Sequence, residues 1–192
     1  DPDLKAQAVL FLSNYVTMEH NGEPSGYLGL VLPDEDLLVF IRGPLDAWED
    51  TMRFNLTAAA QLSRFAVRHW KERGAAGRIV HVASRAGHRG DSPAHWHYAA
   101  SKGGMLAMHK TIARQYAREG ILSFAITPGF TDTSMAGDYL DSRGGPGLLA
   151  DIPLGRVAEP EEIARLVEFC ALDAPPSMTG ATLDANGASY VR

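Results

Sequence analysis

The stretch RIVHVAS, Arg78–Ser84, and the stretch ILSFAIT, Ile121–Thr127, decide the fold of this chain. Each is a short, mainly apolar run, which predicts a strand buried on both faces of a sheet. Between them, apolar residues recur at helical spacing from Tyr98 to Glu119, and Gly120 ends that segment. A strand, a helix and a second strand in this order predict two parallel strands joined by a crossover helix.

The same alternation continues on both sides of this unit. DLLVF, Asp36–Phe40, predicts a further buried strand, and residues 44–72 predict a long helix. Towards the C-terminus, Pro160 opens a helix, and ATLDANG, Ala181–Gly187, predicts a closing strand and turn. We therefore predict an α/β fold, a Rossmann-like, doubly wound parallel sheet.

The length of 192 residues fits one domain, so residues 1–192 are predicted to form a single unit. Residues 1–35 are an atypical N-terminal segment, in which AVLFLSNYV and YLGLVLP could each form a strand around the turn-like HNGEPSG. Residues 131–156 are rich in Gly, Asp and Ser and predict a looser segment after the Ile121–Thr127 strand.

The overall composition excludes several classes of partner. Hydrophobic residues make up 45% of the chain and charged residues 21%, and the net charge is -5. An acidic chain argues against nucleic acid and against an anionic membrane surface, so a small-molecule partner is expected. No apolar run reaches the length of a membrane span and no signal peptide is visible, so the cytoplasm is the expected location.

Cysteine and histidine residues give no strong indication of a metal site. Cys170 is the single cysteine and lies in the apolar stretch LVEFCAL, which favours a buried structural thiol. A zinc site needs three or four ligands in fixed geometry, whereas the histidines near Ser84 straddle a predicted strand and a loop. We expect no metal at this cluster, which consists of His81, His88, His95 and His97.

The pattern Tyr98-Ala-Ala-Ser-Lys102 carries the strongest chemical signal. Positions i and i+4 lie on one face of a helix, and a lysine ammonium there lowers the pKa of a nearby tyrosine. Tyr98 would then serve as a general acid or base near neutral pH. Ser84 ends the preceding strand, so its hydroxyl and that of Tyr98 could converge on one substrate oxygen.

These residues belong to a larger set of blocks. GRIVHVASRAG, YAASKGGMLAM, ITPGFTDTSM, IPLGRVAEPEEIA and TGATLDANGASYV resemble the successive blocks of the short-chain dehydrogenase/reductase family, in its order and at about its spacing. The resemblance covers roughly residues 36–192. It implies an oxidoreductase that transfers a hydride between NAD or NADP and a carbonyl or secondary alcohol. Ketoacyl-thioester reduction is one substrate class that it suggests.

The resemblance also implies roles for individual residues. Ser84 would hold the substrate oxygen and Tyr98 would be the acid/base. Lys102 would tune Tyr98 and bind the cofactor ribose, and Asn55, in the block FNLTAAAQLSR, would join a proton relay. Further residues implied to contact the cofactor are Pro128, Gly129, Thr131 and Thr133 at the nicotinamide end and Gly43 at the adenine-ribose end.

The segment 131–156 matches the family's substrate-binding lid, and the resemblance implies a homodimer or homotetramer. The apolar wall of such a lid would comprise Met135, Tyr139, Leu140, Leu148 and Leu149, although a plain surface helix explains them equally well. Arg85 and Arg89 could attract an anionic substrate, but solvated loop charge is the favoured interpretation.

Two features depart from the family pattern. The glycine-rich turn T-G-x-x-x-G-x-G, which lets the backbone approach a pyrophosphate, is not found. In DLLVFIRG, residues 40–42 replace the N-N-A of the family block. Three explanations stay open: a truncated or incomplete chain, a diverged N-terminus that still binds cofactor, or a catalytically silent binding or interaction protein.

Overall fold

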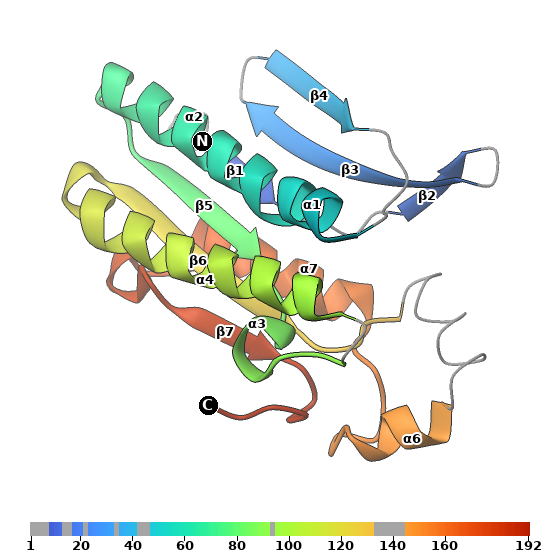
Figure 1. The fold of residues 1–192 in the computed structure, drawn as a ribbon. Helices are drawn as coiled ribbons and strands as arrows, with labels where there is room; N and C mark the ends of the chain where they lie inside the picture. The colour runs from blue at the N-terminus through green and yellow to red at the C-terminus, as the bar shows by residue number, and fades with distance from the viewer. Residues whose placement is uncertain are drawn as a thin grey trace.

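The computed structural model describes residues 8–12, 17–20, 23–32, 35–41, 47–92, 95–132 and 145–192. Within these ranges one sheet is parallel throughout, with its strands in the order β1-β5-β6-β7 (Figure 1). This arrangement confirms the predicted α/β class. The strands of this sheet are β1 (Ala8–Leu12), β5 (Gly77–Val82), β6 (Ile121–Pro128) and β7 (Thr182–Ala185).

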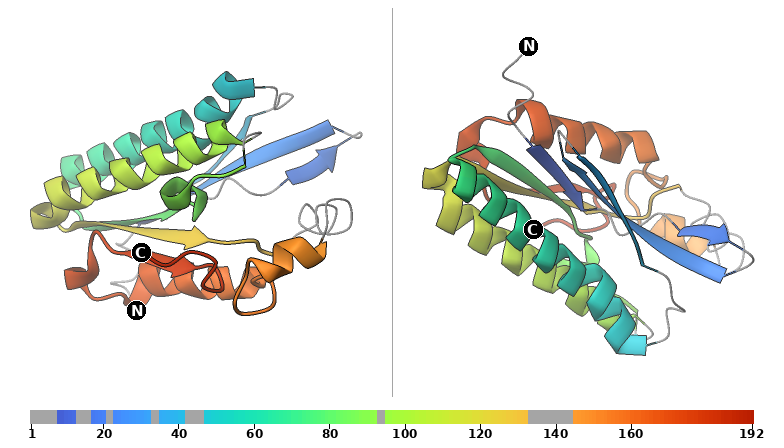
Figure 2. Two further views of the ribbon diagram at one scale, coloured as in Figure 1. Left: turned by 60° about the horizontal axis from the view of Figure 1, so that its bottom comes forward. Right: turned by 90° about the horizontal axis from the view of Figure 1, so that it is seen from above.

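Helices cover both faces of the parallel sheet. Figure 2 shows α2 and α4 on one face and α7 on the other. Gly74 and Gly120 follow the two long helices with φ of 60° and 77°, left-handed values that glycine adopts without strain. The helical segments of these two layers are α1 (Ala47–Met52), a π-helical turn (Arg53–Thr57), α2 (Ala58–Arg73), α4 (Trp96–Tyr116) with a 3₁₀ turn (Ala117–Glu119), and α7 (Pro160–Glu168) with a second π-helical turn (Phe169–Asp173). A further 3₁₀ turn lies at Pro176–Met178.

The alternation of side chains along the central strands builds two cores. Ile79 of β5 and Ala125 of β6 belong to the core beneath α2 and α4. Their sequence neighbours Val80 and Phe124 belong to the core beneath α7. Burial on both faces is what a doubly wound sheet requires. The apolar face of α4 joins the first core, as expected, through Met105, Met108, Ile112 and Tyr116.

The N-terminal part departs from the expected topology. Asp36–Phe40 is a strand, as predicted, but it belongs to a second, antiparallel sheet of order β2-β3-β4. The place beside β5 is taken by β1 instead. An apolar run does not specify its partner strand, and only Pro33 and Asp34 separate β3 from β4, so pairing these neighbours costs little loop entropy. The strands are β2 (Thr17–His20), β3 (Glu23–Leu32) and β4 (Glu35–Ile41).

Smaller differences lie in the connecting segments. The segment between β5 and α4 contains a short helix, α3 (Ala86–Arg89), and α4 begins at Trp96, two residues before Tyr98. The predicted lid contains α6 (Gly145–Ala150), while residues 133–144 lie outside the described ranges. Among the helices of the described residues, none has the length and apolar character needed to cross a membrane.

Candidate active site

Two of the predicted site residues, Ser84 and Pro128, lie at the carboxyl ends of β5 and β6. Ser84 follows β5 after Ala83, and Pro128 is the last residue of β6. The backbone N–H of Arg85 donates to the carbonyl oxygen of Pro128 at 3.0 Å, which joins the two strand ends. Ligands of open α/β sheets bind at the carboxyl ends of the strands, so this is the expected edge for a substrate and cofactor.

Ser84 is held in a tight turn against α4. Its side chain is buried, and its Oγ accepts a hydrogen bond from the N–H of Ala86 at 3.1 Å. A Cβ atom added to Gly87 would lie 2.8 Å from the carbonyl carbon of Lys102, closer than real Cβ atoms come. Glycine at this position therefore lets the Ser84 turn contact the backbone of α4 beside Lys102.

Lys102 and Tyr98 lie one turn apart on α4. Lys102 is 1% exposed, and its Nζ donates to the carbonyl oxygen of Val82 at 3.0 Å. The same Nζ lies 5.7 Å from the centroid of the Tyr98 ring. Desolvation by burial lowers the pKa of Lys102 to about 7. The amine can therefore gain and lose a proton near neutral pH, next to the predicted acid/base.

Asn55 reaches this cluster through a residue that the sequence interpretation missed. Asn55 lies in the π-helical turn between α1 and α2 and is buried. Its Nδ2 donates to Ser101 Oγ at 3.0 Å, and Ser101 Oγ donates to the carbonyl oxygen of Tyr98 at 2.7 Å. A serine inside a helix commonly bonds a carbonyl of the preceding turn, which is the signal that could have identified Ser101.

Of the residues predicted for the nicotinamide end, Pro128 is the last residue of β6, and Gly129 and Thr131 follow it. A Cβ atom on Gly129 would lie 2.9 Å from the Cα of Asn186, so only glycine fits there without a shift. Thr131 Oγ1 donates to the Gly129 carbonyl oxygen at 3.5 Å. Thr133 and Gly43 lie outside the described residues.

Lys102 and the turn at Gly129 flank Ser84 on the edge of the sheet where NAD(P) would bind. The buried Lys102 amine, which can change its charge near neutral pH, bonds to Val82, two residues before Ser84. The tightly packed turn at Gly129 is joined through the Pro128 carbonyl to Arg85, one residue after Ser84. The described residues could therefore hold the nicotinamide-ribose end of the cofactor. The sequence lacks the usual glycine-rich turn for the pyrophosphate end.

Arg85 does not behave as the solvated loop charge that the sequence favoured. Its side chain is only 9% exposed, with Cζ 4.9 Å from the centroid of the Phe130 ring and Nη1 3.6 Å from Asp151 Oδ2. The aromatic ring covers the guanidinium face, which explains the burial of a charged residue. Arg89 remains 36% exposed and binds the same Asp151 oxygen at 3.0 Å.

The histidines separate into different environments. His81 is fully buried on β5 with its ring centroid 5.7 Å from that of His109, and burial lowers their pKa values to about 3 and about 4. His88 instead stacks on Tyr190. Within the described part of the chain, no group of three His, Cys, Asp or Glu side chains is arranged to hold a metal ion.

Cys170 is buried as expected. Burial raises the pKa of its thiol to about 11, which keeps it protonated and unreactive. This agrees with the predicted structural role.

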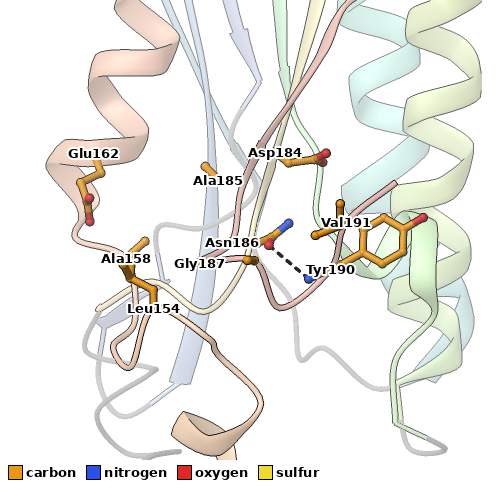
Figure 3. A pocket seen from close by; sticks show the side chains of 10 residues that line it. Leu154, Ala158, Glu162, Asp184, Ala185, Asn186, Gly187, Tyr190 and Val191 are labelled. Atoms are coloured by element: carbon orange, nitrogen blue, oxygen red, sulfur yellow. Dashed lines mark hydrogen bonds between the residues drawn. The ribbon is translucent and has the colours of Figure 1, made fainter.

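A separate pocket of about 310 Å³ lies where β7 ends (Figure 3). Two of its lining residues are joined, because Asn186 Oδ1 accepts a hydrogen bond from the Tyr190 N–H at 3.2 Å. Glu162 at the start of α7 lies at another side of the pocket. None of the predicted catalytic or cofactor-binding residues lines it, so this pocket does not coincide with the Ser84–Lys102 cluster.

Comparison with known proteins identifies similar chains. The family profile described as enoyl-(acyl carrier protein) reductase matches residues 38–187. The 3-oxoacyl-[acyl-carrier-protein] reductase FabG of Haemophilus influenzae is 34% identical over 146 residues, which cover 76% of this chain and 59% of that protein. FabG of Pseudomonas aeruginosa is 33% identical over 178 residues, covering 91% of this chain and 71% of that protein.

A solved structure shares the same architecture. It is a crystal structure with bound NADP of an Agrobacterium tumefaciens protein assigned as a 2-deoxy-D-gluconate 3-dehydrogenase. The TM-score is 0.71 at 27% identity, with 76% of this chain and 59% of that chain covered.

The parallel sheet with helices on both faces defines a Rossmann-like α/β protein, and Ser84 and Pro128 lie at the strand ends where such proteins bind ligands. The chain belongs to the short-chain dehydrogenase/reductase family, as its sequence blocks predicted. The cofactor class of this family is NAD(P), in agreement with the predicted cofactor. The chain spans 59% of the length of the Haemophilus influenzae relative.

Proposed function

We propose that this protein is an NAD(P)-dependent oxidoreductase that interconverts a carbonyl and a secondary alcohol, with Tyr98 as the acid/base. The observation that carries the proposal is the buried Lys102 amine, 5.7 Å from the Tyr98 ring centroid and bonded to β5 just before Ser84. Burying an amine is costly, so its retention beside a tyrosine favours a chemical role over a packing role.

The chain's own residues divide the work in a simple way. Bound NAD(P)H supplies the hydride. In the reduction, Tyr98 donates its hydroxyl proton to the substrate oxygen. Ser84 Oγ accepts from the Ala86 N–H, which leaves the Ser84 proton available to hold that same oxygen. A charged Lys102 favours the tyrosinate that remains.

The remaining roles extend this proposal. Asn55 positions the start of α4 through Ser101 and takes part in returning a proton to Tyr98. Lys102 also binds the cofactor ribose. The proposed cofactor contacts elsewhere are Pro128, Gly129, Thr131 and Thr133 at the nicotinamide end and Gly43 at the adenine-ribose end. Either NAD or NADP is compatible with these residues.

A cofactor titration followed by a Tyr98→Phe comparison tests the proposal. We expect NADH or NADPH to bind the purified chain at micromolar levels, measured by fluorescence and by thermal shift. Tyr98→Phe should retain that binding and lose turnover by orders of magnitude. A folded protein that binds neither cofactor, or a variant with unchanged turnover, would overturn the assignment.

A 3-ketoacyl thioester is the proposed substrate class. Two FabG proteins, whose name is 3-oxoacyl-[acyl-carrier-protein] reductase, are 34% and 33% identical to this chain. This substrate class is tested by the reduction of acetoacetyl-CoA, which is measured as the loss of NAD(P)H absorbance. A panel of simple ketones serves as the comparison, and equal or better rates with them would argue against the thioester class.

The alternative is a catalytically silent binding or interaction protein with the same fold. The missing T-G-x-x-x-G-x-G motif favours it. The joint presence of Ser84, Tyr98, Lys102 and Asn55 opposes it, because a silent protein has no chemical need for that set. The cofactor titration separates the two.

The molecular context completes the proposal. We propose one domain, a lid over residues 131–156 that includes Leu148 and Leu149, a cytoplasmic location, and a homodimer or homotetramer formed through α2 and α4. The exposed large apolar side chains Phe65 (54%) and Trp96 (68%) on these helices support the assembly. Light scattering on the wild type and on Phe65→Glu tests this oligomer. A monomeric wild type would contradict the proposed assembly.

A further inference from the structure

Arg85 is a buried cation whose hydrogen-bonding capacity is incompletely used. Its side chain is 9% exposed, and its Nη1 makes no hydrogen bond within the described part of the chain. Asp151 Oδ2 lies 3.6 Å from that nitrogen, which is beyond hydrogen-bond distance. An unsatisfied buried donor on a charged group is costly, so the site is incomplete without another acceptor.

The carboxylate near Arg85 is already committed to another residue. Arg89 Nη1 donates to Asp151 Oδ2 at 3.0 Å and to the carbonyl oxygen of Ser189 at 2.9 Å. Asp151 is also 53% exposed, so solvent weakens its effect on Arg85. Asp91 acts on Arg85 only through space. Two guanidinium groups therefore share one close carboxylate, and an excess of positive charge remains on the buried one.

Arg85 also lies beside the proposed chemistry. It directly follows Ser84, and its guanidinium covers Phe130, two residues beyond Pro128. Its partner Asp151 follows α6 in the proposed lid. The guanidinium is thus surrounded by the two turns that carry the predicted site residues and by the end of the lid helix.

We propose that Arg85 is a specificity-determining residue that binds an anionic group, a carboxylate or a phosphate, carried by the substrate alongside its reacting carbonyl. The inference rests on the proposed function for the identity of the reacting group. A planar, buried guanidinium forms strong, charge-assisted bonds with such oxygens. Asp151, which is 3.6 Å from Arg85 Nη1, would yield part of that pairing to the substrate anion.

Anion binding provides a test that needs no turnover. Succinate and inorganic phosphate are titrated separately into the full chain by calorimetry, which distinguishes carboxylate from phosphate. We expect saturable binding to the wild type and a loss of about tenfold or more in affinity in Arg85→Gln. Arg114→Gln, which removes the same charge from an exposed position on α4, should match the wild type.

Asp151→Asn separates recognition from a purely structural role. If Arg85 receives an anion, removing the competing carboxylate strengthens binding severalfold, the opposite of Arg85→Gln. If Arg85 serves only to pair with Asp151, Arg85→Gln and Asp151→Asn both destabilise the local structure, and anion binding falls in both variants. This arm decides the question even if Arg85→Gln fails to fold. No binding of either anion up to about 10 mM would overturn the inference.

Turnover then connects the anion to the substrate. With NADH or NADPH, 4-oxopentanoate is compared with its methyl ester, which differs in charge. We expect the acid to be preferred in kcat/KM, and Arg85→Gln to abolish the preference by raising KM for the acid alone. Equal use of acid and ester by the wild type would remove Arg85 from specificity while leaving the oxidoreductase proposal intact. Absence of cofactor binding would instead remove the oxidoreductase proposal, and the calorimetry would still decide the anion site.

Discussion

Lys102 Nζ donates a 3.0 Å hydrogen bond to the carbonyl oxygen of Val82, which joins α4 to the strand that leads to Ser84. The lysine is 1% exposed and is one of the largest fully buried side chains of the described residues. A single amine thus links the position of Tyr98 to the end of β5.

The first prediction concerns the pH dependence of this amine. Its ordinary pKa of 10.5 falls to about 7 in the folded protein. Between these values the unfolded chain binds more protons, so the lysine makes stability rise with pH, by at most about 1.4 kcal/mol per unit. Lys102→Met should remove this component and abolish turnover. Urea unfolding of the wild type and of Lys102→Met between these two pH values measures this component. Identical slopes of unfolding free energy against pH in the two proteins would contradict the prediction.

The second prediction concerns acid stability. His81 and His109 titrate at about 3 and about 4 when folded, against an ordinary pKa of 6.5. The unfolded chain therefore binds more protons as pH falls from 6.5 towards 4, and stability declines over that range. His81→Leu should reduce this decline in the free energy of unfolding by up to about 1.4 kcal/mol per pH unit, without loss of stability near neutral pH. The control is His69→Leu, at a partly exposed position, and a flattening of the same size there would refute the assignment.

The third prediction addresses the link between Asn55 and Ser101. Ser101→Ala removes the hydroxyl that accepts from the Asn55 amide and donates to the Tyr98 carbonyl. We expect a loss of about 1–3 kcal/mol in the free energy of unfolding and a decrease in kcat. A double-mutant cycle with Asn55→Ala should give a coupling of about 0.5–3 kcal/mol. Additive effects would show that the two side chains act independently.

The fourth prediction tests the contact of the Ser84 turn with α4. Gly87→Ala would place a Cβ atom 2.8 Å from backbone atoms of Lys102, which cannot move aside as a side chain could. We expect a loss of about 1–3 kcal/mol together with reduced turnover. Gly147→Ala in α6 is the matched control, because its Cβ would meet nothing within 4 Å. Equal stability of the two variants would show that the close contact relaxes without cost.

The sequence predicted the parts of the fold that rest on periodicity and on glycine. The strands before Ser84 and Gly129 and the helices ending at Gly74 and Gly120 all follow from apolar spacing and helix-stop signals. The pairing of Asp36–Phe40 could not be predicted, because partner choice depends on competing loop entropies and not on the run itself.

The site was predictable to a different degree. The spacing of Tyr98 and Lys102 is local, so a helix places them together once it forms. The burial of Arg85 depends on Phe130 and Asp151, which are distant in sequence, and the role of Ser101 depends on Asn55, 46 residues away. Contacts of this kind are set by tertiary packing and leave no periodic signal.

The π-helical turn at Arg53–Thr57 also makes the chain unusually sensitive to insertions and deletions at one point. A π turn accommodates one residue more than a regular helix does, and each residue advances an α-helix by about 100°. Deleting one residue there would let a single unbroken helix form while rotating everything before it relative to α2. The hydrogen bond between Asn55 and Ser101 would then be lost. We therefore expect related chains to keep the same number of residues in this turn, even where the surrounding sequence varies.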